Sequence, residues 1–325
     1  MATAEQIKAL VRSHFENNDE QFSSVALQVA AQQARQGHET IAKQIRDAVQ
    51  KARSSMPIVP VIQFKREISD LIICKNANNR LSELIVSDSI KNKLKKVLLE
   101  YRQQDKLKHH GLTNRRKILI TGPPGTGKTL TASIIAGELH LPLMIVMMDK
   151  LVTKFMGETS ARLRQVFDTI KEHQGVYLFD EFDSIGTDRG FDNDVGEMRR
   201  VLNSFLMFIE QDDSSSIIVA ATNSSRILDK ALFRRFDDVF HYDNPSDKEI
   251  GRLIHNRLGA AVLGGEATSK SLLQQAAGLS HAEIVQACDN ALKESILSAQ
   301  DSVSIDLLKS ALAEKKQAYD ITRSI

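Results

Sequence analysis

The sequence is poor in features that mark specialised classes of protein. Its 325 residues include two cysteines, Cys74 and Cys288, which lie far apart and have no CxxC spacing. Such a pair indicates a reducing compartment and neither a zinc site nor a disulfide framework. The first residues, MATAEQIKAL, lack the basic start and apolar run of a signal peptide, and no apolar run approaches transmembrane length. We therefore expect a cytoplasmic protein without a membrane span.

Signatures of several enzyme and binding classes are also missing. The net charge of +2 is near neutral, and basic and aromatic residues do not interleave, so the composition does not favour a nucleic-acid partner. The protease motifs HExxH and GxSxG do not occur, so any proteolysis would need a separate partner chain. The guanine-binding motif NKxD is absent as well, which argues against a GTPase.

The most specific motif present is GPPGTGKT at residues 122–129, which fits the P-loop pattern in full. A strand-like apolar run, 117–121, precedes it, and 130–139 reads as a helix. In this context backbone N–H groups face phosphate, Lys128 reaches the β- and γ-phosphates and the Thr129 hydroxyl binds Mg²⁺. The residues predicted to hold the nucleotide here are Pro124, Gly125, Thr126, Gly127, Lys128, Thr129 and Leu130.

Further apolar runs alternate with helical patterns after this loop. Runs at 143–147, 176–179 and 217–221 read as buried strands, and 238–242 is a candidate fifth. This alternation predicts an α/β fold with a mostly parallel sheet. After Pro245 the strands stop, and two S-x-x-E capping boxes indicate helices. We assign 81–246 to a large α/β subdomain and 247–325 to a helical C-terminal lid.

The N-terminal part, residues 1–53, reads as short amphipathic helices that can pack as a small helical domain. Residues 54–80 are assigned to a linker, since Pro57 and Pro60 oppose helix there. The helices could form an extension that packs on the main domain, or a docking domain for a substrate or partner protein. Because the linker sets them apart, we favour docking.

Acidic and amide side chains follow two of the predicted strands. Asp180 and Glu181 end the run 176–179 as in a Walker B motif, where Asp180 would hold Mg²⁺ and Glu181 would polarise the attacking water. Asn223 ends the next strand and can orient that water, because ligands lie at the carboxyl edge of a parallel sheet. Arg234 and Arg235 follow shortly after, where guanidinium groups could stabilise the charge on the transferred phosphoryl group.

Taken in order, GPPGTGKT, LFDEFD, AATN and LDKALFRRFD resemble the AAA ATPases of the AAA+ superfamily, from about Leu81 to the last residue. The resemblance implies a P-loop NTPase fold, a nucleotide between the α/β subdomain and the lid, and a ring that is usually hexameric. Asn223 resembles the sensor-1 residue. Arg234 and Arg235 resemble paired arginine fingers that act on a neighbouring subunit, and their adjacency is similar to the microtubule-severing and endosomal-sorting branch.

Two more segments resemble functional motifs of this family. The stretch 278–284, GLSHAEI, resembles the lid motif G-x-S-G-A-[DE]-[IL], which packs near adenine, with His281 in place of the glycine and Ala282 retained. Ile85 and Val86 are expected to flank the adenine as well. The stretch KFMGE resembles pore loop 1, which grips an extended polypeptide, and 186–194 would be the second pore loop. The predicted substrate contacts are Lys154, Phe155, Met156 and Gly157.

The sequence therefore predicts an ATPase that uses ATP and Mg²⁺, forms a homo-oligomeric ring and remodels, unfolds or threads a protein substrate in a central pore. A separate protein partner could bind through residues 1–53. Two alternatives remain. One is a nucleic-acid motor or loader, which the near-neutral net charge does not favour. The other is a slow ATP-dependent scaffold or switch, which only measurements of ATP turnover separate from a motor. Either kind of ATPase could act with a separate protease chain.

Overall fold

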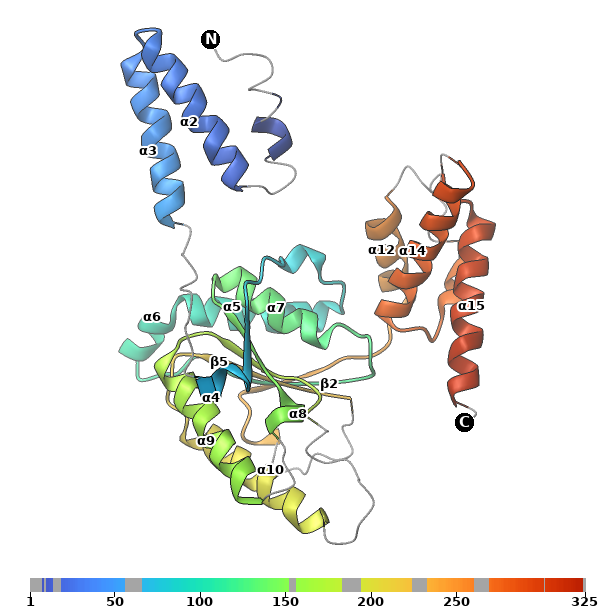
Figure 1. The fold of residues 1–325 in the computed structure, drawn as a ribbon. Helices are drawn as coiled ribbons and strands as arrows, with labels where there is room; N and C mark the ends of the chain where they lie inside the picture. Colours follow the sequence, from blue (N-terminus) through green and yellow to red (C-terminus); the bar gives the residue numbers. More distant parts are fainter. Residues whose placement is uncertain are drawn as a thin grey trace. The chain divides into compact units, whose positions relative to one another are not determined.

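The computed structural model divides the chain into two compact units, Met1–Val59 and Pro60–Ile325 (Figure 1). It describes residues 8, 10–13, 19–55, 66–151, 156–182, 194–223, 233–259, 269–300 and 302–323. Within these ranges no helix combines the length and apolar character needed to cross a membrane.

The first unit contains a pair of packed helices, α2 (Asp19–Arg35) and α3 (Glu39–Ser55). Gly37 adopts a left-handed φ of 84° in the turn between them, a conformation that glycine tolerates well. Small and branched side chains on the facing sides are buried, among them Ala30 and Ala42. Residues 10–13 are also helical, and Ser13 is buried. The helical character predicted for this part of the chain is thus observed where it is described.

The second unit is built on a six-stranded sheet with the strand order β1-β3-β4-β5-β2-β6. Neighbouring strands from β3 to β6 are parallel, as the apolar runs predicted, and β1 pairs with β3 in the antiparallel direction. The α/β fold with a mostly parallel sheet is therefore confirmed. The strands are β1 (Ile72–Lys75), β2 (Lys117–Thr121), β3 (Leu143–Val146), β4 (Val176–Phe179), β5 (Ile217–Thr222) and β6 (Asp238–His241).

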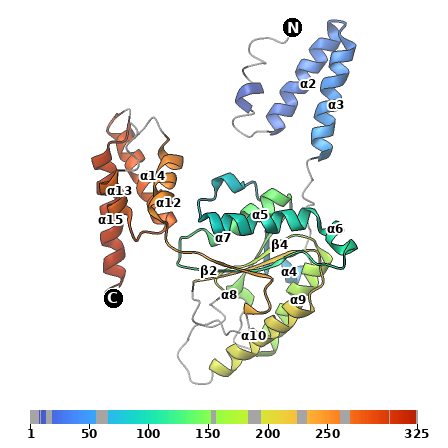
Figure 2. The same ribbon diagram turned by 180° about the vertical axis from the view of Figure 1, so that it is seen from behind.

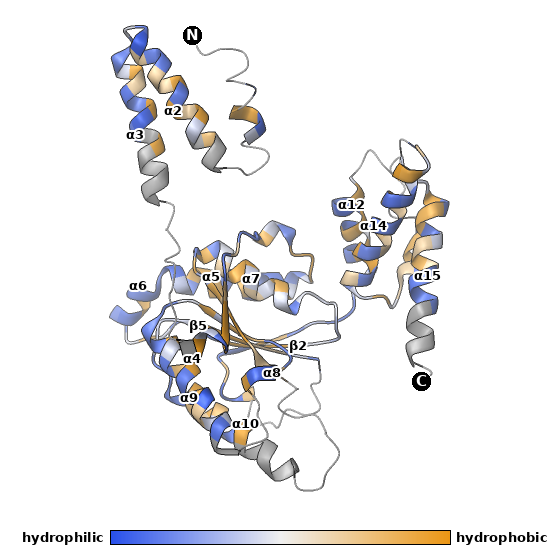
Figure 3. Cartoon of the chain, viewed as in Figure 1, coloured by the Kyte–Doolittle hydropathy of each residue, from blue (hydrophilic) through white to orange (hydrophobic). Residues whose placement is uncertain are grey.

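Helices cover both faces of this sheet, and the strands between them are strongly apolar (Figures 1 and 3). On one face, α5 (Asp88–Arg102) and α7 (Lys128–Leu139) bury residues such as Leu94 and Ile135 against β2 and β5. On the other, α9 (Met156–Glu172) and α10 (Asp194–Gln211) form a core that includes Phe167 and Phe205. Short elements complete this part: α4 (Arg66–Ser69), η1 (Leu81–Glu83), α6 (Gln104–His109) and α8 (Met148–Leu151).

Part of the segment assigned to a linker belongs to the sheet. Ile72–Lys75 forms strand β1, and Cys74 pairs with Met144 of β3. The expectation of a linker over all of 54–80 is therefore wrong for these residues. Four residues rich in isoleucine are enough for an edge strand, but the pairing depends on a strand far away in the sequence, which the local pattern does not reveal.

In the described part of the chain after the sheet, four helices share a separate hydrophobic core (Figure 2). Capping boxes begin two of them, at Ser246 with Glu249 and at Ser280 with Glu283, as the sequence predicted. Leu253, Leu272 and Ile284 are among the residues they bury together. The helices are α12 (Asp247–Leu258), α13 (Lys270–Ala276), α14 (His281–Leu297) and α15 (Ile305–Arg323).

Candidate active site

The P-loop joins the end of β2 to the beginning of α7. Gly125 and Gly127 have left-handed φ angles of 75° and 97°, which turn the chain into the helix and are accessible to glycine at little cost. Lys128 is 7% exposed, and its Nζ donates to the carbonyl oxygens of Gly122 and Pro123 at 2.8 and 2.7 Å. The loop is thus closed around the ammonium group, and a positive charge lies at the N-terminus of α7, where anions bind most readily.

Two loop glycines lie directly against other parts of the same unit. A Cβ on Gly122 would come within 2.3 Å of the Tyr242 carbonyl oxygen, and one on Gly125 within 2.7 Å of Ser280 Oγ. Neither position has room for a side chain. Tyr242 follows β6 and Ser280 caps α14, so the phosphate loop is in contact with both the sheet and the lid helices.

Thr129 and Asp180 come together at the edge of the sheet. The Thr129 hydroxyl donates to Asp180 Oδ2 at 2.5 Å. Glu181, the next residue, is exposed and has a left-handed φ of 50°, and its N–H donates to Asp180 Oδ1 at 3.0 Å. Backbone strain at a non-glycine residue is concentrated at functional sites, because the surrounding structure must hold it in place. The turn after β4 therefore presents two carboxylates beside the P-loop, one of them paired with Thr129.

Asn223 follows the central strand β5, which lies between β4 and β2. The N–H of Gly122 donates to the Thr222 carbonyl oxygen at 3.3 Å, so the end of β5 is joined to the first residue of the P-loop. Asn223 is exposed just beyond that contact. The carboxyl ends of β2, β4 and β5 thus bring the P-loop, Asp180 and Asn223 to one edge, where parallel α/β sheets bind their ligands.

The two adjacent arginines differ in their surroundings. Arg235 Nε lies 2.6 Å from Glu210 Oε1 on α10. Arg234 is exposed, and within the described residues it has no hydrogen bond or ion pair. Within the described residues, neither guanidinium group contacts the P-loop of its own chain. Glu210 was not predicted, because a glutamate on an exposed helix face has no distinctive signal in the sequence.

The lid reaches the P-loop through its second capping box. The Ala282 N–H donates to the Gly125 carbonyl oxygen at 2.9 Å. The side chain of Glu283 accepts from the Ser280 N–H at 2.7 Å and holds the first turn of α14 in place. The backbone of this turn therefore approaches the P-loop closely although His281 stands where the lid motif has glycine.

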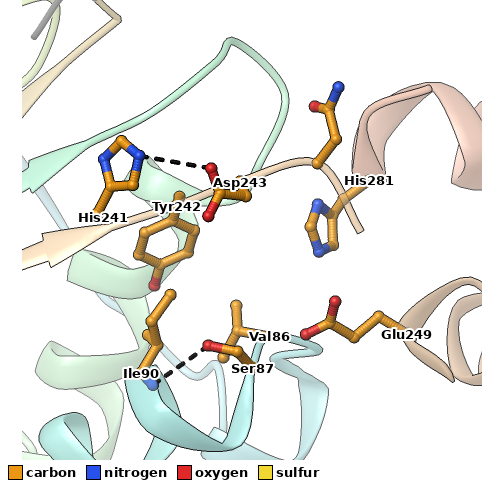
Figure 4. A pocket seen from close by; sticks show the side chains of 9 residues that line it. Val86, Ser87, Ile90, His241, Tyr242, Asp243, Glu249 and His281 are labelled. Carbon is orange, nitrogen blue, oxygen red and sulfur yellow. Dashed lines mark hydrogen bonds and ion pairs between the residues drawn. The ribbon is translucent and has the colours of Figure 1, made fainter. Parts of the chain in front are cut away.

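A polar pocket lies beside this contact (Figure 4). His241 pairs with Asp243 at 3.4 Å on one side of it, and His281 faces Glu249 and Val86 on the other. Both ring nitrogens of His281 are buried and lack a hydrogen-bond partner within the described part of the chain. Burial lowers the pKa of His281, and the Glu249 carboxylate acts in the opposite direction. The lining residues are Val86, Ser87, Ile90, His241, Tyr242, Asp243, Asn244, Glu249 and His281.

The remaining predicted residues are only partly described. Leu130 packs against the core beneath α7, and Ile85 packs against the core of the lid helices, beside Val86 and the pocket. Met156 and Gly157 begin α9, while Lys154, Phe155 and most of 186–194 lie outside the described residues. Tyr242 and Glu249 were not predicted as pocket residues, since only the fold brings them beside Val86 and His281.

Sequence comparisons extend these observations to known proteins. The family model described as the ATPase family associated with various cellular activities (AAA) matches residues 118–244. An uncharacterized AAA family ATPase, y4kL, of Sinorhizobium fredii is 32% identical over 308 residues, which are 93% of this chain and 92% of that protein. An ATP-dependent zinc metalloprotease FtsH of Rhodothermus marinus is 33% identical over 203 residues, 60% of this chain but 29% of that protein.

A solved structure supports the fold assignment. The crystal structure of the FIGL-1 AAA domain superposes with a TM-score of 0.61 and 19% sequence identity, over 82% of this chain and 97% of that chain. The likeness in fold agrees with the family match and with the near full-length similarity to the Sinorhizobium protein. The chain therefore belongs to the AAA family of ATPases and is an ATP hydrolase.

Proposed function

We propose that this ATPase assembles into a homo-oligomeric ring, a hexamer in the presence of ATP, and couples hydrolysis to the remodelling, unfolding or threading of a protein substrate. The observation that best supports a ring is the position of the arginine pair. Arg234 is exposed and Arg235 is held by Glu210, so in the described part neither is joined to its own P-loop. Guanidinium groups that make no contact with their own P-loop are free to act on a neighbouring subunit's ATP.

Within each subunit we assign the steps of hydrolysis to residues at the edge of the sheet. Lys128 binds the β- and γ-phosphates, together with backbone N–H groups of residues 124–130. Glu181 accepts the proton of the attacking water, and Asn223 orients that water. The exposed position of Glu181 beside the Thr129–Asp180 contact supports this arrangement.

The Mg²⁺ ion and the adenine of ATP are also assigned to residues of this site. Thr129 Oγ1 and Asp180 Oδ2 are two oxygen atoms in contact, the ligand type that Mg²⁺ prefers, so they fit a Mg²⁺ ion held directly or through water. When bound with ATP, this ion would neutralise charge on the phosphates. Ile85, Val86, His281 and Ala282 would surround the adenine: Val86 and His281 line the pocket, Ile85 precedes Val86, and the Ala282 N–H donates to the P-loop at Gly125.

Trapping of the substrate tests the proposed function. Glu181→Gln subunits should bind ATP and stay in the ATP-bound form, and a protein substrate should then be captured and recovered by pull-down with ATP. The matched control is the same pull-down with Glu181→Gln/Lys128→Ala subunits, which cannot bind ATP. Equal recovery from both would contradict ATP-dependent substrate engagement.

Phe155→Ala should uncouple hydrolysis from substrate remodelling. In the KFMGE segment the aromatic side chain is proposed to grip polypeptide, not nucleotide, so ATP turnover should stay within about twofold of the parent while remodelling is lost. Phosphate release and unfolding of the trapped substrate measure the two quantities separately. Phe155→Tyr, which keeps an aromatic ring, is the control and should retain most of the remodelling. Full remodelling by Phe155→Ala would exclude a grip by this loop.

Removal of residues 1–59 should leave a folded ATPase that has lost partner recognition. The boundary follows the division into units at Val59, and the second unit contains every residue assigned to ATP hydrolysis. Thermal unfolding should stay cooperative and ATP turnover should match the full chain, whereas capture of the protein partner should fall to background. An insoluble product would support the alternative in which the N-terminal helices serve only as a packed extension.

A further inference from the structure

The contact between Arg235 and Glu210 fixes the direction of a guanidinium group. Glu210 lies one residue before the end of α10, and its Oε1 is 2.6 Å from Arg235 Nε. The pair is formed through Nε, so the two terminal amino groups of Arg235 lie outside it. Because a guanidinium is planar and its donors have a fixed geometry, a carboxylate on one edge determines where the other edge points.

The end of α10 that carries Glu210 is firmly attached to the sheet. The side chain of Asp212, which is fully buried, pairs with Arg116 just before β2. The Lys117 ammonium group donates to the carbonyl oxygen of Ile209 at 2.5 Å. Both contacts hold the last turn of α10 against the start of β2, so Glu210 projects from a rigid support.

The backbone that follows Arg235 is attached to the same place. The Asp237 carboxylate accepts the N–H groups of Arg116 and Lys117 at 2.9 and 2.8 Å, and its own N–H donates to the Lys117 carbonyl oxygen at 2.8 Å. Phe236, between Arg235 and Asp237, is buried. The arginine and its carboxylate partner are therefore both fixed to the beginning of β2, the strand that leads into the P-loop.

We propose that Glu210 is a positioning residue that orients Arg235 so that its terminal amino groups face the ATP of the neighbouring subunit. This inference rests on the proposed ring. Glu210 would not touch nucleotide, so its loss should lower the turnover of the neighbouring site and leave nucleotide affinity unchanged. The two side chains are 30% and 54% exposed, and an exposed ion pair contributes little to stability, so variants at Glu210 should fold.

Mixed rings separate this role from an effect within one subunit. Acceptor subunits carry Arg234→Ala/Arg235→Ala and keep an intact Lys128, while donor subunits carry Lys128→Ala and keep the arginines. Mixed rings whose donors also carry Glu210→Ala should reach a kcat on the order of tenfold lower than mixed rings whose donors keep Glu210. Their KM should be unchanged, because misplacement of a catalytic group acts on the transition state. Glu210→Gln donors should lose less, since the amide oxygen still accepts from Nε.

The control is a donor with Asp213→Asn, which removes another exposed ion pair, between Lys171 and Asp213 at 3.4 Å. These donors should restore as much activity as donors with Lys128→Ala alone. Equal kcat with Glu210→Ala donors, or a loss confined to KM, would overturn the positioning role. If donors with intact Glu210 never restore activity although mixed assemblies form, the arginines do not act between subunits, and the proposed ring mechanism and this inference both fail.

Discussion

Lys128→Ala is expected to abolish ATP binding, whereas Glu181→Gln should keep ATP binding and stop turnover. Lys128 is buried at the start of α7, and its ammonium group contacts the loop that would surround the phosphates. Removal of its charge-assisted hydrogen bonds should weaken ATP binding by about 100-fold or more. Glu181→Gln removes a base and not a phosphate contact, so turnover should fall by about 10²–10⁴-fold at nearly unchanged affinity.

Equilibrium titration with ATP and measurement of phosphate release check both parts. Lys95→Ala, at an exposed position on α5, is the matched lysine control and should leave both quantities unchanged. Thermal unfolding without nucleotide shows whether Lys128→Ala disturbs the loop, since it also frees the Gly122 and Pro123 carbonyl oxygens. Normal turnover of Glu181→Gln would remove Glu181 from the mechanism, and normal affinity of Lys128→Ala would contradict the assignment of the P-loop.

Loss of the arginine pair should produce a subunit that binds ATP and hydrolyses it very slowly. In the described residues neither Arg234 nor Arg235 contacts Lys128, so Arg234→Ala/Arg235→Ala should leave ATP affinity within about twofold. An arginine finger supplied by a second subunit is worth on the order of 10³–10⁵ in rate in related phosphoryl-transfer systems, and a loss of that size is expected. Full activity of the double variant would show that neither residue is a finger.

Complementation between two inactive subunits gives the stronger measurement. Arg234→Ala/Arg235→Ala subunits keep a competent pocket, and Lys128→Ala subunits keep competent arginines. Neither alone should turn over ATP, but in a mixed ring a competent pocket can lie beside a competent finger. Activity should therefore return on mixing, pass through a maximum with the mixing ratio and depend on protein concentration. An arginine that acted within its own subunit would give no recovery at any ratio.

The sequence by itself determined the local features of this protein. The P-loop could be predicted because its glycines, Lys128 and Thr129 all fall within residues 122–129 and form one local loop. The parallel strands were evident from short apolar runs, and both capping boxes from serine and glutamate three residues apart. Each of these patterns depends on interactions between near neighbours in the chain, which the order of residues specifies directly.

Only the tertiary structure decided which distant residues meet. It added Ile72–Lys75 to the sheet, placed Tyr242 against Gly122, and set Glu249 opposite His281. It also gave the two adjacent arginines different surroundings, because Arg235 pairs with Glu210. Such contacts arise when strands and helices far apart in the sequence are packed on one sheet. Their geometry is set by strand order and helix placement, which no local pattern of residue types contains.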